Sequence, residues 1–174
     1  PVEHIEAAKS ELQRQRSAPG YARKKQQDQL RREKKQREYV AQFTREVFVF
    51  LNFHPRHYCL AEKLAECVSL HATPVGSGTV ARTKRIPVAD RARRAVIAWM
   101  RHQATTYDTM VIARIKGERR RVRRELAEQS LELLRPYQQG AELKPDCPLY
   151  LALLLSDNRS NADMENDAQP PSLA

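Results

Sequence analysis

Between residues 39 and 51, apolar side chains recur at intervals of three and four, which places them along one face of an α-helix. The side chains concerned are Tyr39, Val40, Phe43, Val47, Phe50 and Leu51. The run 47–50 taken alone also fits a β-strand, but it continues a helical pattern that begins near Tyr21. We therefore predict one helix over about residues 21–53, with its apolar face against a core.

Further helices are predicted on both sides of this one, and together they indicate an all-α fold. They cover residues 3–16, 56–72, 88–103 and 117–138, with a short apolar helix over 149–155. Proline and glycine interrupt the pattern at Pro19-Gly20, at His54-Pro55 and in the loop 73–79. The side chains expected to face the core are Leu60, Leu64, Cys67, Val68 and His71, then Val88, Ala92, Ala95, Val96 and Trp99, and finally Val122, Leu126, Leu133 and Tyr137.

Apolar residues make up only 41% of the 174 residues, so part of the chain contributes little to a core. Residues 22–38 are almost devoid of apolar side chains, which predicts a helix that is solvated or forms on binding. We predict a polar and basic helical arm over 1–38 and a helical core domain over 39–140. The remainder, 141–174, is predicted to hold the short apolar helix and an acidic, disordered tail.

Positive charge is concentrated in the middle of the sequence. The chain holds 31 basic and 21 acidic residues, a net charge of +10, but residues 75–124 alone hold 14 bases against 3 acids. Residues 125–174 hold 3 bases against 9 acids. Solubility needs no such segregation, whereas a bound anion would relieve the self-repulsion of the basic block. Twelve of its 14 bases are arginine, which can bind phosphate through two parallel hydrogen bonds.

The arginines that begin the helix at 117–138 are placed against the electrostatic preference of that helix. A helix N-terminus carries partial positive charge, so each cation there costs roughly 0.3–1 kcal/mol, and a bound phosphate reverses the effect. The acids Glu125, Glu128 and Glu132 come later. The basic residues beside the Gly76-Ser77-Gly78 loop and on the helix at 88–103 complete the candidate surface. The predicted nucleic-acid contacts are Arg82, Lys84, Arg85, Arg91, Arg94, Arg101, Lys116, Arg119, Arg120, Arg123 and Arg124.

Each basic element also has a purely structural interpretation. Glu125 and Glu128 can pair backwards with Arg121 and Arg124, and the glycine loop can be a plain turn. The bases of 22–38 can pair within a solvated helix or form an arm that folds on RNA or DNA. The acidic tail can cover the basic face or bind partner proteins, as in a protein-interaction adaptor.

A second alternative is an enzyme acting on a phosphate-containing substrate. His102 would act as general base, oriented by Asp108, with Tyr107 beside them, although such a cluster also suits a helix end. His54, His57, Cys59, Cys67 and His71 are ligand types for zinc, but their spacing fits no finger pattern. No metal site and no cofactor are predicted.

Cysteine content and hydropathy indicate a cytoplasmic protein. The three cysteines form no disulfide framework and are expected to be reduced thiols. No apolar signal region is visible near the N-terminus, and the run 149–155 is too short to span a bilayer.

Residues 71–83, 85–87 and 95–102, with Thr105, Tyr107 and Asp108, form a long and specific motif. Through it the chain resembles a bacterial and fungal family of uncharacterised proteins, the domain-of-unknown-function family 2293. The likeness extends to 21–23, 38–40 and 116–117, roughly residues 5–140 in all. It implies a shared domain without an established activity, so no catalytic residue follows from it. Members often begin further upstream, which leaves room for a preceding segment.

These observations predict a helical cytoplasmic protein that binds nucleic acid through backbone phosphates, with RNA ahead of DNA. The adaptor and the enzyme are the alternatives.

Overall fold

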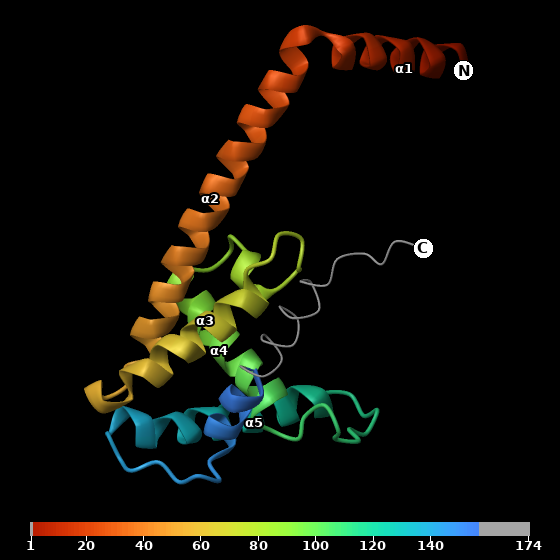
Figure 1. The fold of residues 1–174 in the computed structure, drawn as a ribbon. Helices are drawn as coiled ribbons and strands as arrows, with labels where there is room; N and C mark the ends of the chain where they lie inside the picture. Colours follow the sequence, from red (N-terminus) through yellow and green to blue (C-terminus); the bar gives the residue numbers. More distant parts are fainter. Residues whose placement is uncertain (1, 157–174) are drawn as a thin grey trace, which may run out of the picture. The chain divides into compact units, whose positions relative to one another are not determined.

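The computed structural model describes residues 2–156, and every regular element within them is a helix, as predicted. In chain order the elements are α1 (Val2–Ser17), α2 (Pro19–Leu51), the 3₁₀ turn η1 (Pro55–His57), α3 (Tyr58–Ala72), the 3₁₀ turn η2 (Val80–Arg82), α4 (Val88–Gln103) and α5 (Glu118–Gln138), followed by a helix over 148–156 (Figure 1). From residue 157 on, the tail predicted to be disordered lies outside the described residues.

The chain divides into two compact units, Pro1–Ala41 and Gln42–Ala174. The first unit contains α1 and the beginning of α2, and among its described residues no side chain is buried. Its ion pairs are local: Arg14 lies 2.8 Å from Glu11, and Arg31 lies 2.8 Å from Asp28. Exposed pairs at this spacing contribute only about 0.3–0.5 kcal/mol each. This unit therefore presents a solvated, charged surface along its helices.

The second unit is built on the apolar end of α2. Phe43, Val47 and Leu51 follow one another at intervals of four and are fully buried, which confirms this part of the predicted stripe, whereas Tyr39 and Val40 are partly exposed. Complete burial of one such side chain stabilises the fold by about 1.5–3 kcal/mol. Phe50 lies at the edge of this stripe and remains partly exposed.

The buried face of α3 is rotated relative to the prediction. Leu64 and Val68 are buried as expected, but Leu60 and Cys67 are partly exposed and His71 is exposed. The face is completed instead by the small side chains of Ala61, Ala65, Ser69 and Ala72. Small residues allow α4 to approach closely, and a count of large apolar residues overlooks them. On α4 the stripe from Ala92 to Trp99 is buried as predicted, and Met100 joins it.

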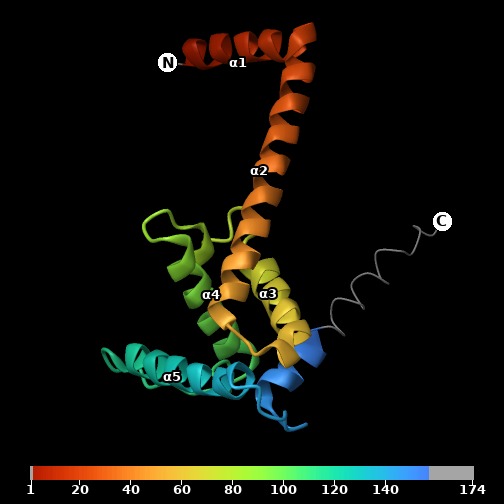
Figure 2. The same ribbon diagram turned by 90° about the vertical axis from the view of Figure 1, so that its left-hand side faces the viewer.

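Helix α5 runs across one end of α3 and α4, an arrangement that is the same in both views (Figures 1 and 2). Val122, Leu126 and Tyr137 are buried as predicted, but Leu134 rather than Leu133 lies in the core. The buried position between Leu126 and Leu134 is Ser130, whose hydroxyl donates to the Leu126 carbonyl at 2.7 Å. That hydrogen bond satisfies the hydroxyl, so a polar residue can continue the buried face.

The end of α5 is tied to the junction between α2 and α3. The His54 amide donates to the Tyr137 carbonyl at 3.0 Å, and the Arg56 guanidinium donates to the Gly140 carbonyl at 2.8 Å. The Gln138 side-chain amide donates to the carbonyl of the last residue of α2 at 2.9 Å. These contacts join residues more than 80 positions apart and close the second unit around its core.

Candidate nucleic-acid interface

Helix α5 begins at a glycine. Gly117 is the N-cap residue with φ of +91°, and no side chain caps the backbone amides of the first turn. Those amides carry the partial positive charge of the helix N-terminus. Glu118 lies in the first turn of α5. The start of this helix therefore carries an acidic side chain as well as the arginines that the sequence places there.

Arg121 is engaged by acids of its own helix. Its Nε and Nη2 atoms donate to the two oxygens of Glu118 at 3.1 and 2.5 Å, and its Nη1 donates to Glu125 at 2.6 Å. The hydrogen bond from Arg121 lowers the pKa of Glu118, and the pKa of Arg121 is raised by the same partner. The predicted pairing of Glu125 with Arg121 is confirmed, and this arginine is already neutralised locally.

The neighbouring basic side chains surround a cavity of about 490 Å³. It is lined by Lys116, Gly117, Arg119, Arg120 and Arg123. All four cations are exposed, and within residues 2–156 Lys116, Arg119 and Arg120 have neither an ion pair nor a side-chain hydrogen bond. A hollow bounded by four cations and one uncovered glycine backbone has the electrostatics of an anion site.

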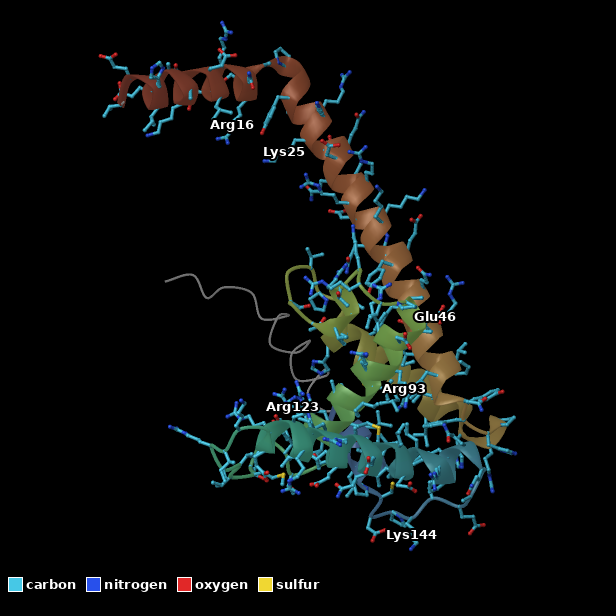
Figure 3. All side chains as sticks on the ribbon, turned by 180° about the vertical axis from the view of Figure 1, so that it is seen from behind. Arg16, Lys25, Glu46, Arg93, Arg123 and Lys144 are labelled. Atoms are coloured by element: carbon cyan, nitrogen blue, oxygen red, sulfur yellow. The ribbon has the colours of Figure 1, made fainter. Side chains whose placement is uncertain are left out.

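Arg123 links this cavity to the turn that follows α4. Its Nε donates to the Tyr107 hydroxyl at 3.0 Å, and this hydrogen bond lowers the pKa of Tyr107. Figure 3 labels Arg123 on α5. The Arg101 guanidinium carbon lies 5.0 Å from the centre of the Tyr107 ring. Burial of Arg101 lowers its pKa, and its Nε has no hydrogen-bond partner among the described residues. Tyr107 therefore contacts one arginine from α4 and one from α5 on the same surface.

The predicted contact between His102 and Asp108 is present. His102 Nδ1 lies 2.7 Å from Asp108 Oδ1, and the His102 ring lies 5.3 Å from the Tyr107 ring in an edge-to-face arrangement. Both side chains of the pair are about half exposed, at 42% and 58%. An aspartate in this position orients the imidazole and selects its tautomer. The three catalytic candidates thus come together on the edge of the basic surface.

The remaining predicted contacts divide into two groups. Arg82 donates to the carbonyls of Thr73 and Pro74, and Arg91 donates to the Ala81 carbonyl at 3.0 Å. These two guanidinium groups hold the loop between α3 and α4 in place. The other side chains are exposed, and they are Lys84, Arg85, Arg94 and Arg124.

Sequence reasoning missed the connection between Tyr107 and Arg123. The two residues are separated by 16 positions and an irregular segment, so no periodicity joins them. Tyr107 was a catalytic candidate only, whereas in the structure it also fixes the orientation of an arginine in the basic surface. The tyrosine and the arginine are each visible in the sequence, but their pairing depends on how α5 packs against α4.

Two of the three histidines considered for zinc, His54 and His57, make structural hydrogen bonds. His54 Nδ1 accepts from the Arg56 amide, and His57 Nε2 donates to the Ala141 carbonyl at 2.9 Å. Across residues 2–156, no three side chains of metal-binding type are grouped as a metal ion would require. The three cysteines are free thiols. None of the helices described is both long and apolar enough to cross a membrane.

Comparison with known protein families gives one match. Residues 52–138 match the family described as an uncharacterized conserved protein, DUF2293. The chain belongs to this family. The matched region runs from the end of α2 to the end of α5 and contains both the basic cavity and the His102 turn. No curated protein and no solved structure matches the chain.

Proposed function

We propose that this member of the DUF2293 family binds nucleic acid through its backbone phosphates. The observation that carries the proposal is the cavity at the start of α5, where Lys116, Arg119 and Arg120 surround a hollow without acidic partners in residues 2–156. Phosphates are anions at regular spacing, and cationic side chains supply most of the affinity for them. Arg101 and Arg123 extend the surface through Tyr107.

The charge pattern on α5 favours phosphate over a general role in solubility. Arg121 points at acids of its own helix, while its neighbours on the cavity do not. Solubility alone does not require Glu118 and Glu125 to pair with Arg121 rather than with another arginine of this helix. The separation of paired from uncompensated cations instead supports an external anionic partner.

The test is fluorescence anisotropy with labelled RNA and DNA across a salt series. The variant Arg119→Gln/Arg120→Gln/Arg123→Gln should bind more weakly, and each lost phosphate contact should reduce the salt slope by roughly 0.7–0.9. Glu118→Gln/Arg121→Gln is the control, because it removes an ion pair from the same helix without changing the net charge. Affinity that does not depend on salt, or a triple variant that binds like the native chain, contradicts the proposal.

We place RNA ahead of DNA, because arginine side chains that can stack on unpaired bases are typical of RNA recognition. The same titrations compare the two. The adaptor alternative is tested by pull-down with and without nuclease: partners that survive nuclease treatment favour protein binding, whereas their loss supports nucleic acid.

A second candidate function is catalysis on a phosphate-containing substrate. The distance of 2.7 Å between His102 and Asp108 favours it, because a general base needs an orienting partner at hydrogen-bond distance. Incubation with labelled RNA should then give cleavage that His102→Ala abolishes and Asp108→Asn reduces. Cleavage that survives His102→Ala removes this histidine from the reaction.

A further inference from the structure

A second cavity, of about 410 Å³, lies between α3, η2 and α4. Its wall is largely apolar and includes Val68, Ala98 and Trp99, while His71 and His102 lie at its polar parts. The volume falls in the range of about 300–1,000 Å³ that is usual for sites that bind small molecules. This combination suits a flat ring with polar groups on its edge.

Trp99 contributes an aromatic side chain to the wall of this cavity. The side chain is only 5% exposed, and its indole Nε1 is buried without a hydrogen-bond partner among the described residues. A buried indole N–H usually has a partner. A flat ring in the cavity would lie against the part of the indole that lines its wall.

The cavity is connected to the basic surface by direct contacts. His102 lines the cavity, and its ring lies 5.3 Å from that of Tyr107. The Tyr107 hydroxyl accepts from Arg123, which lines the cavity at the start of α5. An apolar site for a ring and a cationic site for phosphate are therefore joined through two side chains.

From this juxtaposition we propose that the cavity between α3, η2 and α4 takes an unstacked base of a single-stranded nucleic acid. The inference rests on the proposed phosphate binding and deepens it, since it names the strand state of the partner. Bases in a duplex are stacked and paired, so they cannot enter the cavity without leaving the helix. Single strands are commonly held by a basic surface together with an aromatic wall on which bases stack.

Trp99 is the single tryptophan of the chain, so its emission reports directly on the cavity. The experiment titrates the native protein with a single-stranded oligonucleotide and with an abasic oligonucleotide of equal length. Both should bind with salt-dependent affinity, but only the strand with bases should change the Trp99 emission. Its affinity should also be higher by on the order of tenfold, as expected for one stacked base. A blunt duplex should leave the Trp99 emission unchanged, as the abasic strand does.

A matched pair of variants on α4 tests the cavity itself. Ala98→Phe fills it without changing charge, while Ile97→Phe adds an aromatic ring at a neighbouring position that is also partly exposed but does not line the cavity. Ala98→Phe should abolish the emission change and the advantage of bases over abasic sites. Ile97→Phe should preserve both.

The outcomes separate this inference from the proposed function. Equal affinity and equal Trp99 emission with the two strands overturn the inference while leaving phosphate binding intact. Absence of binding by either strand at low salt overturns both. The comparison of the two strands uses the native chain, so it tests whether a base enters the cavity even if Ala98→Phe does not fold.

Discussion

Gly140 provides a quantitative test of the way the second unit is closed. Its φ is +69°, and a Cβ atom at this position would lie 2.6 Å from Cγ of the His54 ring. The ring is exposed, and its Nδ1 accepts from the Arg56 amide at 3.3 Å, a hydrogen bond that is lost if the ring is displaced. Gly140→Ala therefore introduces both an unfavourable backbone conformation and a steric clash.

The two effects can be given magnitudes. A left-handed conformation costs a residue with a side chain about 1–2 kcal/mol. Displacement of the exposed His54 ring by the added methyl group costs a further amount of about 0.5–1.5 kcal/mol, the usual net contribution of the hydrogen bond that would be lost. Gly140→Ala should therefore lower the free energy of unfolding by about 1.5–3.5 kcal/mol, measured by urea denaturation followed by circular dichroism.

Gly117 supplies the matched control. Its φ is also positive, at +91°, but nothing lies within 4 Å of a Cβ built there. Gly117→Ala should show only the backbone cost, and the reduced freedom of the unfolded chain affects both variants alike. Adding His54→Ala to the Gly140→Ala variant should restore the part of the unfolding free energy that the steric clash removes. If Gly140→Ala is no more destabilising than Gly117→Ala, the proposed packing of His54 against Gly140 is wrong.

Three further predictions follow from single contacts. Because the Arg123 hydrogen bond lowers the pKa of Tyr107, Arg123→Gln should shift one tyrosine ionisation to higher pH in an ultraviolet absorbance titration; an unchanged titration contradicts the contact. Arg82→Gln should speed amide hydrogen exchange in the loop 73–87, whereas Arg85→Gln, at an exposed loop position, should not; equal rates in the two variants argue against the anchoring role. Cys59 is the exposed cysteine, whereas Cys67 and Cys147 are partly exposed, so one thiol should react faster with a thiol reagent than the other two in the native protein, and all three should react alike after unfolding; three equally fast thiols in the native protein would contradict this order of exposure.

The basic surface lies within the residues that match the family, whereas the charged helices of the first unit do not. Both cavities lie between residues 68 and 123, inside the matched range 52–138. The charged helices of the first unit lie before that range. Binding that depends on Arg119 and Arg120 should therefore persist when bases of residues 22–38 are neutralised, and the salt series described above can measure this directly.

The helix boundaries were largely predictable because they depend on local signals. The helix predicted over 88–103 is α4, and the helix predicted over 117–138 begins one residue later in the structure, at Glu118. The rotation of α3 was not predictable, since three alanines rather than the larger Leu60 face the core. Hydrophobic periodicity weighs large residues, whereas close packing between helices selects small ones.

The candidate site was predicted in part. His102, Tyr107 and Asp108 lie within seven residues, so their proximity follows from the chain itself, and the structure brings them together. Arg82 and Arg91, which the sequence presents as free cations, instead bind loop carbonyls. Carbonyl partners of this kind leave no trace in composition, because every residue has one.

Local sequence is enough to specify the helices and the concentration of positive charge, because helical periodicity and net charge depend on neighbouring residues. The packing of the helices selects which cations among the described residues are paired, and it joins Arg123 to Tyr107 across 16 positions. It also created the cavity beside Trp99, since α3, η2 and α4 contribute to its wall from separate parts of the chain. These features depend on the packing of one helix against another, and no local pattern specifies that packing.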